Sequence, residues 1–168
     1  LRNRLYRTQI MISYFSSSIT DIFNNPDIES TIIVPITDIG FIQDASIRNI
    51  AINNPEIWAG VLTYCSGRND GLISRHIEQQ CNTQLVFISC ITTKNGCCEL
   101  LRETYLQMLD TILSSSSRTC PETHMPTIYL IEPSIGVTNV FNQTIEDIAS
   151  LSTKYGVGLN YVLPSSIL

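Results

Sequence analysis

The stretch TIYLIEPSIGVTNVFNQTIEDIASL, residues 127–151, combines three patterns that together decide the fold. Residues 127–132 are mostly apolar and predict a buried strand. Residues 133–139 form a turn of proline, glycine and small residues, and a helical pattern follows over residues 142–156, with Gly156 placed to end it. The turn is either a cradle whose backbone N–H groups hold a phosphate or an ordinary connection between a strand and a helix. The two readings fit the sequence about equally well.

The rest of the chain repeats this alternation of strand and helix patterns. Strands are predicted over residues 30–36, 58–65, 83–91, 127–132 and 157–164. Helices are predicted over residues 18–26, 44–52, 72–81, 97–113 and 142–156, with a flexible loop over residues 114–126. Such alternation predicts an α/β fold of three layers, α/β/α, with a central, mostly parallel (mixed) sheet. We read residues 1–26 as an N-terminal lead-in segment and residues 27–168 as a single α/β domain.

The composition excludes several classes of partner. A chain of 168 residues with 43% hydrophobic residues fits one soluble domain with its own core. Its net charge is −5, so broad binding to a duplex backbone is disfavoured. No apolar run approaches the roughly 18 residues of a membrane span. The chain begins with leucine rather than methionine, and we therefore expect it to be a segment of a longer polypeptide.

No metal or cofactor is predicted. The six cysteines form no C-x-x-C pair and His76 and His124 are the only histidines, which disfavours a zinc site. The sequence also lacks the G-x-S-x-G, P-loop and G-x-G-x-x-G motifs of serine hydrolases, NTPases and dinucleotide enzymes. Cys90 lies in the predicted strand 83–91, where a buried, reduced thiol is expected. This cysteine usage predicts a reducing, intracellular and cytoplasmic setting.

Ligands of parallel sheets bind beyond the carboxyl ends of the strands. Three loops are predicted there, residues 35–44, 92–96 and 133–139. Asp38 is a candidate general base or acceptor for a ribose hydroxyl, although a plain turn residue is the favoured reading. Lys94 and Asn95 could touch a phosphate or a base, and a solvated turn is the simpler alternative. The residues whose N–H groups could hold a phosphate are Ser134, Ile135, Gly136, Val137 and Thr138.

Side chains outside these loops have simpler readings. Trp58 and Tyr64 could stack a base, but aromatic residues serve more often in core packing. His76 falls in the predicted helix 72–81 and is read as a structural histidine. These residues are therefore not included among the predicted site residues.

Two longer stretches resemble the macro domain, a family of ADP-ribose-binding modules. They are IEPSIGVTNVFNQTIEDI, residues 131–148, and FISCITTKNGCCELLRETYLQML, residues 87–109. The resemblance implies a macro-like fold in which the loop around Gly136 wraps a diphosphate. It also implies that Pro35 and Asp38 stand where the family has two asparagines, and that Gly40 is what remains of a first-loop glycine run.

These departures lead to three functional hypotheses. The first is a non-catalytic macro-like binding or scaffold module of a larger polypeptide, such as a viral replicase. Such a module would recognise a nucleotide, an ADP-ribose-like ligand or single-stranded RNA, and would contact other domains of its parent polypeptide. The second is an active ADP-ribosyl hydrolase in which Asp38 replaces the usual asparagine. The third is a purely structural domain that docks other proteins.

Overall fold

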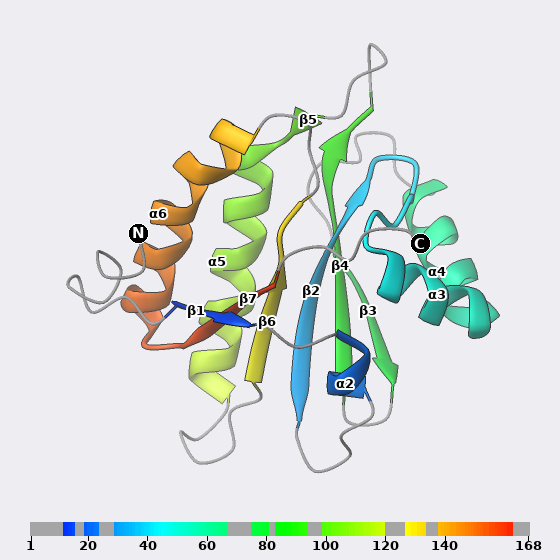
Figure 1. The fold of residues 1–168 in the computed structure, drawn as a ribbon, viewed down its shortest axis with the longest axis horizontal. Coiled ribbons are helices and arrows are strands. Elements are labelled where there is room, and N and C mark those ends of the chain that lie inside the picture. The colour runs from blue at the N-terminus through cyan, green and yellow to red at the C-terminus, as the bar shows by residue number, and fades with distance from the viewer. Residues whose placement is uncertain are drawn as a thin grey trace.

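The computed structural model describes residues 12–15, 19–23, 29–66, 75–80, 83–93, 99–119, 127–133 and 138–162. Within these ranges a seven-stranded sheet lies between two layers of helices (Figure 1). The strands are β1 (Ile12–Phe15), β2 (Ser30–Thr37), β3 (Arg75–Gln80), β4 (Thr83–Thr92), β5 (Glu99–Leu100), β6 (Thr127–Ile131) and β7 (Leu159–Val162). The helices are α2 (Ile19–Phe23), α3 (Ala45–Asn53), α4 (Pro55–Ser66), α5 (Arg102–Thr119) and α6 (Thr138–Tyr155).

The sheet is mixed and mostly parallel, as predicted. Its strand order is β1-β7-β6-β2-β4-β3, and β5 pairs with β4. The pairs β1–β7, β7–β6, β6–β2 and β2–β4 are parallel, whereas β3 and β5 run antiparallel to β4. The edge strand β1 falls within the predicted lead-in segment. The domain boundary drawn at residue 26 stays a prediction.

Two hydrophobic clusters fix the layers on either side of the sheet. Figure 1 shows α5 and α6 on one side and α3 and α4 on the other. On the first side Tyr105, Leu109 and Ile148 pack with sheet residues such as Ile33. On the second side α2, α3 and α4 pack against the opposite face, and the core includes Ile19, Ile22, Ile47, Ile57, Val61, Ile32 and Phe87. The predicted three-layer α/β/α fold is therefore confirmed.

The strand predicted over residues 58–65 is wrong, because this segment belongs to the helix α4. Pro55 occupies the first helical position, where its missing N–H has no partner to lose and its fixed φ suits the helix. The helix then buries Ile57 and Val61, four residues apart, while Leu62 remains 39% exposed. Burial along one helical stripe, with Trp58 and Cys65 packed beside it, stabilises the helix against the core.

The helix predicted over residues 72–81 is also wrong. Residues 75–80 form the strand β3, which pairs antiparallel with β4 from Arg75↔Ile88 to Gln80↔Thr83. His76 therefore lies in a strand opposite Phe87 and not in a helix. Backbone pairing with a central strand outweighs the local apolar spacing that suggested a helix.

Several predicted elements are correct with shifted ends. The helix predicted over residues 97–113 begins only at Arg102, because residues 99–100 first pair with β4 as β5, and it continues to Thr119. Residues 114–119 of the predicted flexible loop are therefore helical, since serine costs a helix only a few tenths of a kcal/mol. Helix α6 begins at Thr138 and ends at Tyr155, and Gly156 follows it as the predicted terminating glycine, with a left-handed φ of 65°. No helix within the described ranges has both the length and the apolar character to cross a membrane.

Candidate functional site

β2, β4 and β6 run parallel, so their carboxyl ends lie together at one end of the sheet. The connection after β2 leads to α3 on one face, whereas the connection after β6 leads to α6 on the other (Figure 1). Open α/β sheets bind ligands at such a switch point. The register of β2 with β6 ends at Ile33↔Leu130, although β2 itself continues to Thr37. β6 ends at Ile131, so β2 extends beyond the end of β6 and continues to pair with β4 as far as Thr37.

Pro35 lies in the part of β2 beyond its pairing with β6, opposite Ile88 of β4. The strand predicted over residues 30–36 passes through this proline and ends one residue later than predicted, at Thr37. Proline has no N–H to donate. Because the described pairing with β6 has already ended at Ile33, that missing donor removes no bond between β2 and β6.

The loop after β2 is closed by its own hydrogen bonds. The N–H of Thr37 donates to the carbonyl of Phe41 at 3.1 Å, and the N–H of Phe41 returns to the hydroxyl of Thr37 at 2.9 Å. The N–H of Gly40 donates to the carbonyl of Thr37, and that of Asp38 to the carbonyl of Ile91. These four N–H groups are therefore already satisfied and are not free to hold a phosphate.

Gly40 has a conformational reason to be glycine. Its φ of 85° lies in the left-handed region that side chains rarely adopt. A Cβ at this position would also lie 3.4 Å from both the Cys65 sulfur and the Leu62 Cδ2. Gly40 is itself buried, and its predicted role in ligand contact stays a prediction.

Asp38 connects two of the three predicted loops. Its Oδ1 accepts a hydrogen bond of 2.8 Å from the hydroxyl of Thr93, the residue after β4. Its own N–H donates to Ile91 at 2.9 Å, so both its backbone and its side chain are fixed. The half-buried carboxylate can accept a further hydrogen bond from a hydroxyl or amine.

The other predicted loop residues are only partly covered by the structure. Lys94, Asn95 and the residues from Ser134 to Val137 lie outside the described residues. Thr138 is the first residue of α6, and its backbone N–H therefore lies in the first turn of that helix. Trp58 is partly buried against the core, which agrees with its simpler reading. Cys90 is a buried free cysteine, as predicted.

The loop after β2, called the first loop below, carries two exposed apolar side chains that were not predicted as site residues. Ile39 is 69% exposed and Phe41 is 44% exposed. The guanidinium carbon of Arg48, in the first turn of α3, lies over the Phe41 ring at 5.3 Å from its centroid. The available signal was the apolar pair in the loop DIGFIQD, residues 38–44, where a turn is expected to be polar.

A carboxyl group with altered acidity follows β6. Glu132 is partly buried, and this burial raises the pKa of its carboxyl, while a hydrogen bond with Tyr161 acts in the opposite direction. The nearby Tyr105 is fully buried, and burial raises the pKa of its phenol well above the ordinary value. The Tyr105 hydroxyl makes no hydrogen bond to any residue that the structure describes.

We expect Glu132→Gln to become progressively more stable than the wild type as pH rises. The pKa of the Glu132 carboxyl is raised above its ordinary value of 4.5 in the folded protein. The carboxyl therefore contributes fully to the free energy of unfolding below pH 4.5, and this contribution is lost as the pH rises through the folded-state pKa. Glutamine is neutral throughout. Chemical denaturation at pH 4 and pH 7 measures the difference, and Glu29→Gln at an exposed site is the matched control. A difference that stays constant with pH would contradict the assignment.

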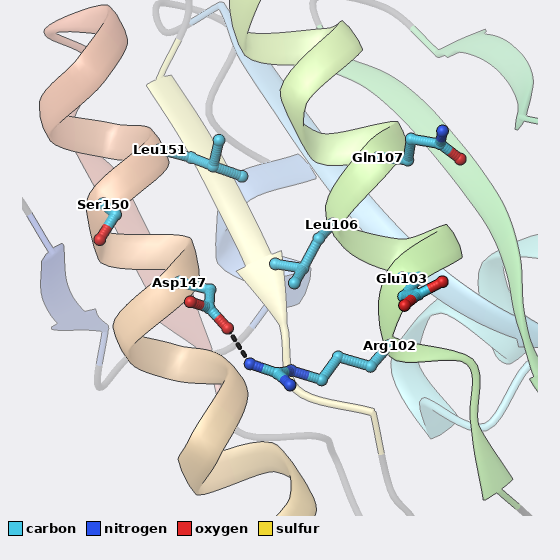
Figure 2. A pocket seen from close by; sticks show the side chains of 7 residues that line it. All are labelled: Arg102, Glu103, Leu106, Gln107, Asp147, Ser150 and Leu151. Atoms are coloured by element: carbon cyan, nitrogen blue, oxygen red, sulfur yellow. Dashed lines mark hydrogen bonds and ion pairs between the residues drawn. The ribbon is translucent and has the colours of Figure 1, made fainter.

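A separate cavity of about 500 Å³ opens between α5 and α6. Figure 2 shows Arg102 reaching from α5 to Asp147 of α6, with which it forms an ion pair, and Leu106 and Leu151 facing the space between the helices. Its lining also includes Glu103, Gln107 and Ser150. None of the sequence-predicted site residues lines this cavity. No group of metal-binding side chains occurs among the residues that the structure describes.

Comparison by sequence yields no relative. No model of a protein family matches the chain, and no curated protein matches it. Comparison of structures gives a different result.

A macrodomain protein from Streptomyces coelicolor aligns with a TM-score of 0.64 and 11% identity, over 90% of this chain and 97% of that chain. The macrodomain of DarG from Mycobacterium tuberculosis aligns with a TM-score of 0.63 and 13% identity, over 93% and 99%. DarTG from Thermosipho africanus, solved in complex with ADP-ribose, aligns with a TM-score of 0.63 and 11% identity, over 91% of this chain and 41% of that chain. Almost the whole of this chain therefore has the macrodomain fold, in a strongly diverged sequence.

Proposed function

We propose that this chain is a non-catalytic binding module of a larger polypeptide and that it recognises an ADP-ribose-like nucleotide. The observation that carries the proposal is that the parallel neighbours β2 and β6 are followed by α3 and α6 on opposite faces of the sheet, at a switch point of a macrodomain fold. Switch points bind nucleotides in open α/β sheets. A structure with the same fold was solved with ADP-ribose, which supports this ligand class.

The chemistry of the first loop supports binding without turnover. The resemblance places Pro35 and Asp38 at the two asparagine positions, and proline offers no side-chain hydrogen bond. The carboxylate of Asp38 is already held by Thr93. Because the N–H groups of Thr37, Asp38, Gly40 and Phe41 already donate to atoms of the protein, they cannot also polarise a ligand's reacting centre. The parent polypeptide, its viral replicase type and the cytoplasmic setting stay predictions.

Calorimetric titration with ADP-ribose, followed by thermal unfolding, tests the proposal. We expect saturable binding, and ligand at 100 times its dissociation constant should add about 2.7 kcal/mol to the free energy of unfolding. Gly136→Val should abolish binding, because a side chain there would enter the space that the resemblance assigns to the diphosphate. Gly158→Val is the matched control, because Gly158 is exposed just before the amino end of β7, at the end of the sheet away from the proposed site.

Incubation with an ADP-ribosylated protein separates binding from catalysis. We expect no release of ADP-ribose above the rate without this chain. Release that disappears in Asp38→Ala would instead establish the hydrolase. Absence of any stabilisation by nucleotides would reject the binding proposal and leave the structural docking domain.

A further inference from the structure

The cavity between α5 and α6, called the α5–α6 groove below, opens on the outer side of its helical layer, and most of the residues that line it are exposed. It lies apart from the site proposed for the nucleotide, since none of the predicted site residues lines it. We propose that residues 1–11, which lie outside the described residues, dock in this groove through their sequence Arg4-Leu5-Tyr6-Arg7. This docking is independent of nucleotide binding.

Two polar bridges between α5 and α6 bound the groove. Arg102 pairs with Asp147 at one end (Figure 2). At the other end the hydroxyl of Tyr155 donates to Oδ1 of Asp110 at 2.6 Å, and the Lys154 Nζ lies 3.7 Å from the same oxygen. Positions 102 and 110 on α5, and 147 and 155 on α6, are both eight residues apart. The helices therefore run in the same direction, and the bridges lie about 12 Å apart along them.

The floor of the groove between the two bridges is apolar. Leu106 on α5 and Leu151 on α6 each lie four residues from both bridges, and Figure 2 shows both side chains facing the space between the helices. They pack only partly against the buried cluster beneath. Burying the rest of such side chains is favourable. The groove therefore suits a segment with apolar side chains at its middle and polar groups at its ends.

Carboxylates outnumber cations around the groove. Six charged side chains of α5 and α6 are described, four of them acidic (Glu103, Asp110, Glu146 and Asp147) and two basic (Arg102 and Lys154). Glu103 forms no ion pair with any residue that the structure describes. Both described contacts of Asp110 use Oδ1, which leaves Oδ2 to accept from a further donor. The charge balance therefore favours a cationic occupant.

Residues 1–11, LRNRLYRTQIM, have the complementary composition, with three arginines and no acidic residue. In Arg4-Leu5-Tyr6-Arg7 two apolar side chains stand between two cations. An extended backbone with three residues per turn places the two arginines on one side, about 9 Å apart. Arginine side chains are long enough to reach from there to both bridges, and their planar donors suit carboxylates. The pattern of the segment thus matches that of the groove.

The position of β1 brings this segment to one end of the groove. Ile12 pairs with Leu159 of β7, which follows Tyr155 by four residues and therefore lies within about 14 Å of it. Neighbouring strands are about 5 Å apart. Five extended residues, from Ile12 back to Arg7, span about 17 Å. The segment can therefore enter at the Tyr155 bridge, with Arg7 there and Arg4 at the other end.

Nuclear magnetic resonance of the full chain with labelled methyl groups tests the docking. We expect nuclear Overhauser effects between the methyl groups of Leu5 and those of Leu106 and Leu151, because side chains in contact approach within about 4–4.5 Å. Leu5→Ala should lower the ratio of docked to undocked segment by about 10-fold, measured from the shifts of the Leu106 and Leu151 methyl signals. Thr8→Ala, in the same segment but outside the docking sequence, is the matched control and should leave the ratio unchanged.

A charge exchange tests the expected orientation. Glu103→Lys and Arg4→Glu should each lower the docked ratio by about two- to fivefold, the range of an exposed ion pair. The double variant should recover the ratio of the unaltered chain, because the pair is restored with its signs exchanged. Glu56→Lys is the control, since Glu56 is exposed on α4 at the other face of the sheet.

Each contrary result overturns a defined part of the inference. Absence of any effect between Leu5 and the two groove leucines would overturn the docking itself. Effects seen only between differently labelled chains in a mixed sample would assign the groove to a second copy and overturn docking within one chain. A double variant no better docked than the single variants would overturn the pairing of Arg4 with Glu103. These measurements use no nucleotide, so they leave the proposed function untouched.

Discussion

Phe87→Ala is expected to lower the free energy of unfolding by about 3–5 kcal/mol. Phe87 lies on the central strand β4 and is completely buried in the cluster that joins the sheet to α2, α3 and α4. Removing the ring loses its transfer from water and leaves a cavity that a close-packed interior fills only in part. Urea denaturation measures the change through a lower midpoint at an unchanged slope.

Phe41→Ala is the matched control for this prediction. It makes the same substitution at an exposed position on the first loop, and it should change stability by less than about 0.5 kcal/mol. Equal losses at the two positions would contradict the assignment of Phe87 to the core and of Phe41 to the surface.

Tyr105→Phe is expected to raise the free energy of unfolding by about 1–3 kcal/mol, because a buried hydroxyl without a partner carries its full desolvation penalty. Tyr105 on α5 is fully buried, and its hydroxyl bonds to none of the described residues. Phenylalanine keeps the ring in place and removes only that oxygen. Thermal and urea unfolding both measure the difference.

Tyr161→Phe should have the opposite sign. The Tyr161 hydroxyl forms a hydrogen bond with Glu132, so its removal should lower the free energy of unfolding by about 1 kcal/mol. A loss of stability in both variants would contradict the prediction for Tyr105→Phe, because it would show that the Tyr105 hydroxyl forms a hydrogen bond that the substitution removes.

The sequence predicts the parallel part of the sheet well and its antiparallel edge poorly. Strands β2, β4, β6 and β7 have apolar runs with turn signals at both ends, and burial on both faces produces that pattern directly. β3 does not, because its sequence RHIEQQ has one apolar residue and no apolar run, and the strand depends on backbone pairing with β4, the next strand along the chain. For α4, the strand predicted over residues 58–65 overlooked that a proline suits the first position of a helix, which Pro55 occupies.

The candidate site could be placed from the sequence but not described in detail. The carboxyl-end rule brings Asp38 and Thr93 together through the loops after β2 and β4, and the structure places them within one hydrogen bond. The exposure of Phe41 was not predicted, since it depends on which loop atoms satisfy each other. The partner of Glu132 was also hidden, because Tyr161 lies on another strand. Closure of the loop and burial of a carboxyl are properties of the assembled molecule.

The parallel pairing of β1 with β7 has a practical consequence for truncated versions of the protein. A polypeptide that starts at residue 27 would lack both β1 and α2. The side of β7 that pairs with β1 would then expose unpaired backbone N–H and C=O groups, and strands of other molecules can pair with these groups. Loss of Ile19 and Ile22 would also uncover apolar surface beneath α2. Self-association of such a shortened polypeptide would therefore reflect its missing beginning and would say nothing about the oligomeric state of the intact chain.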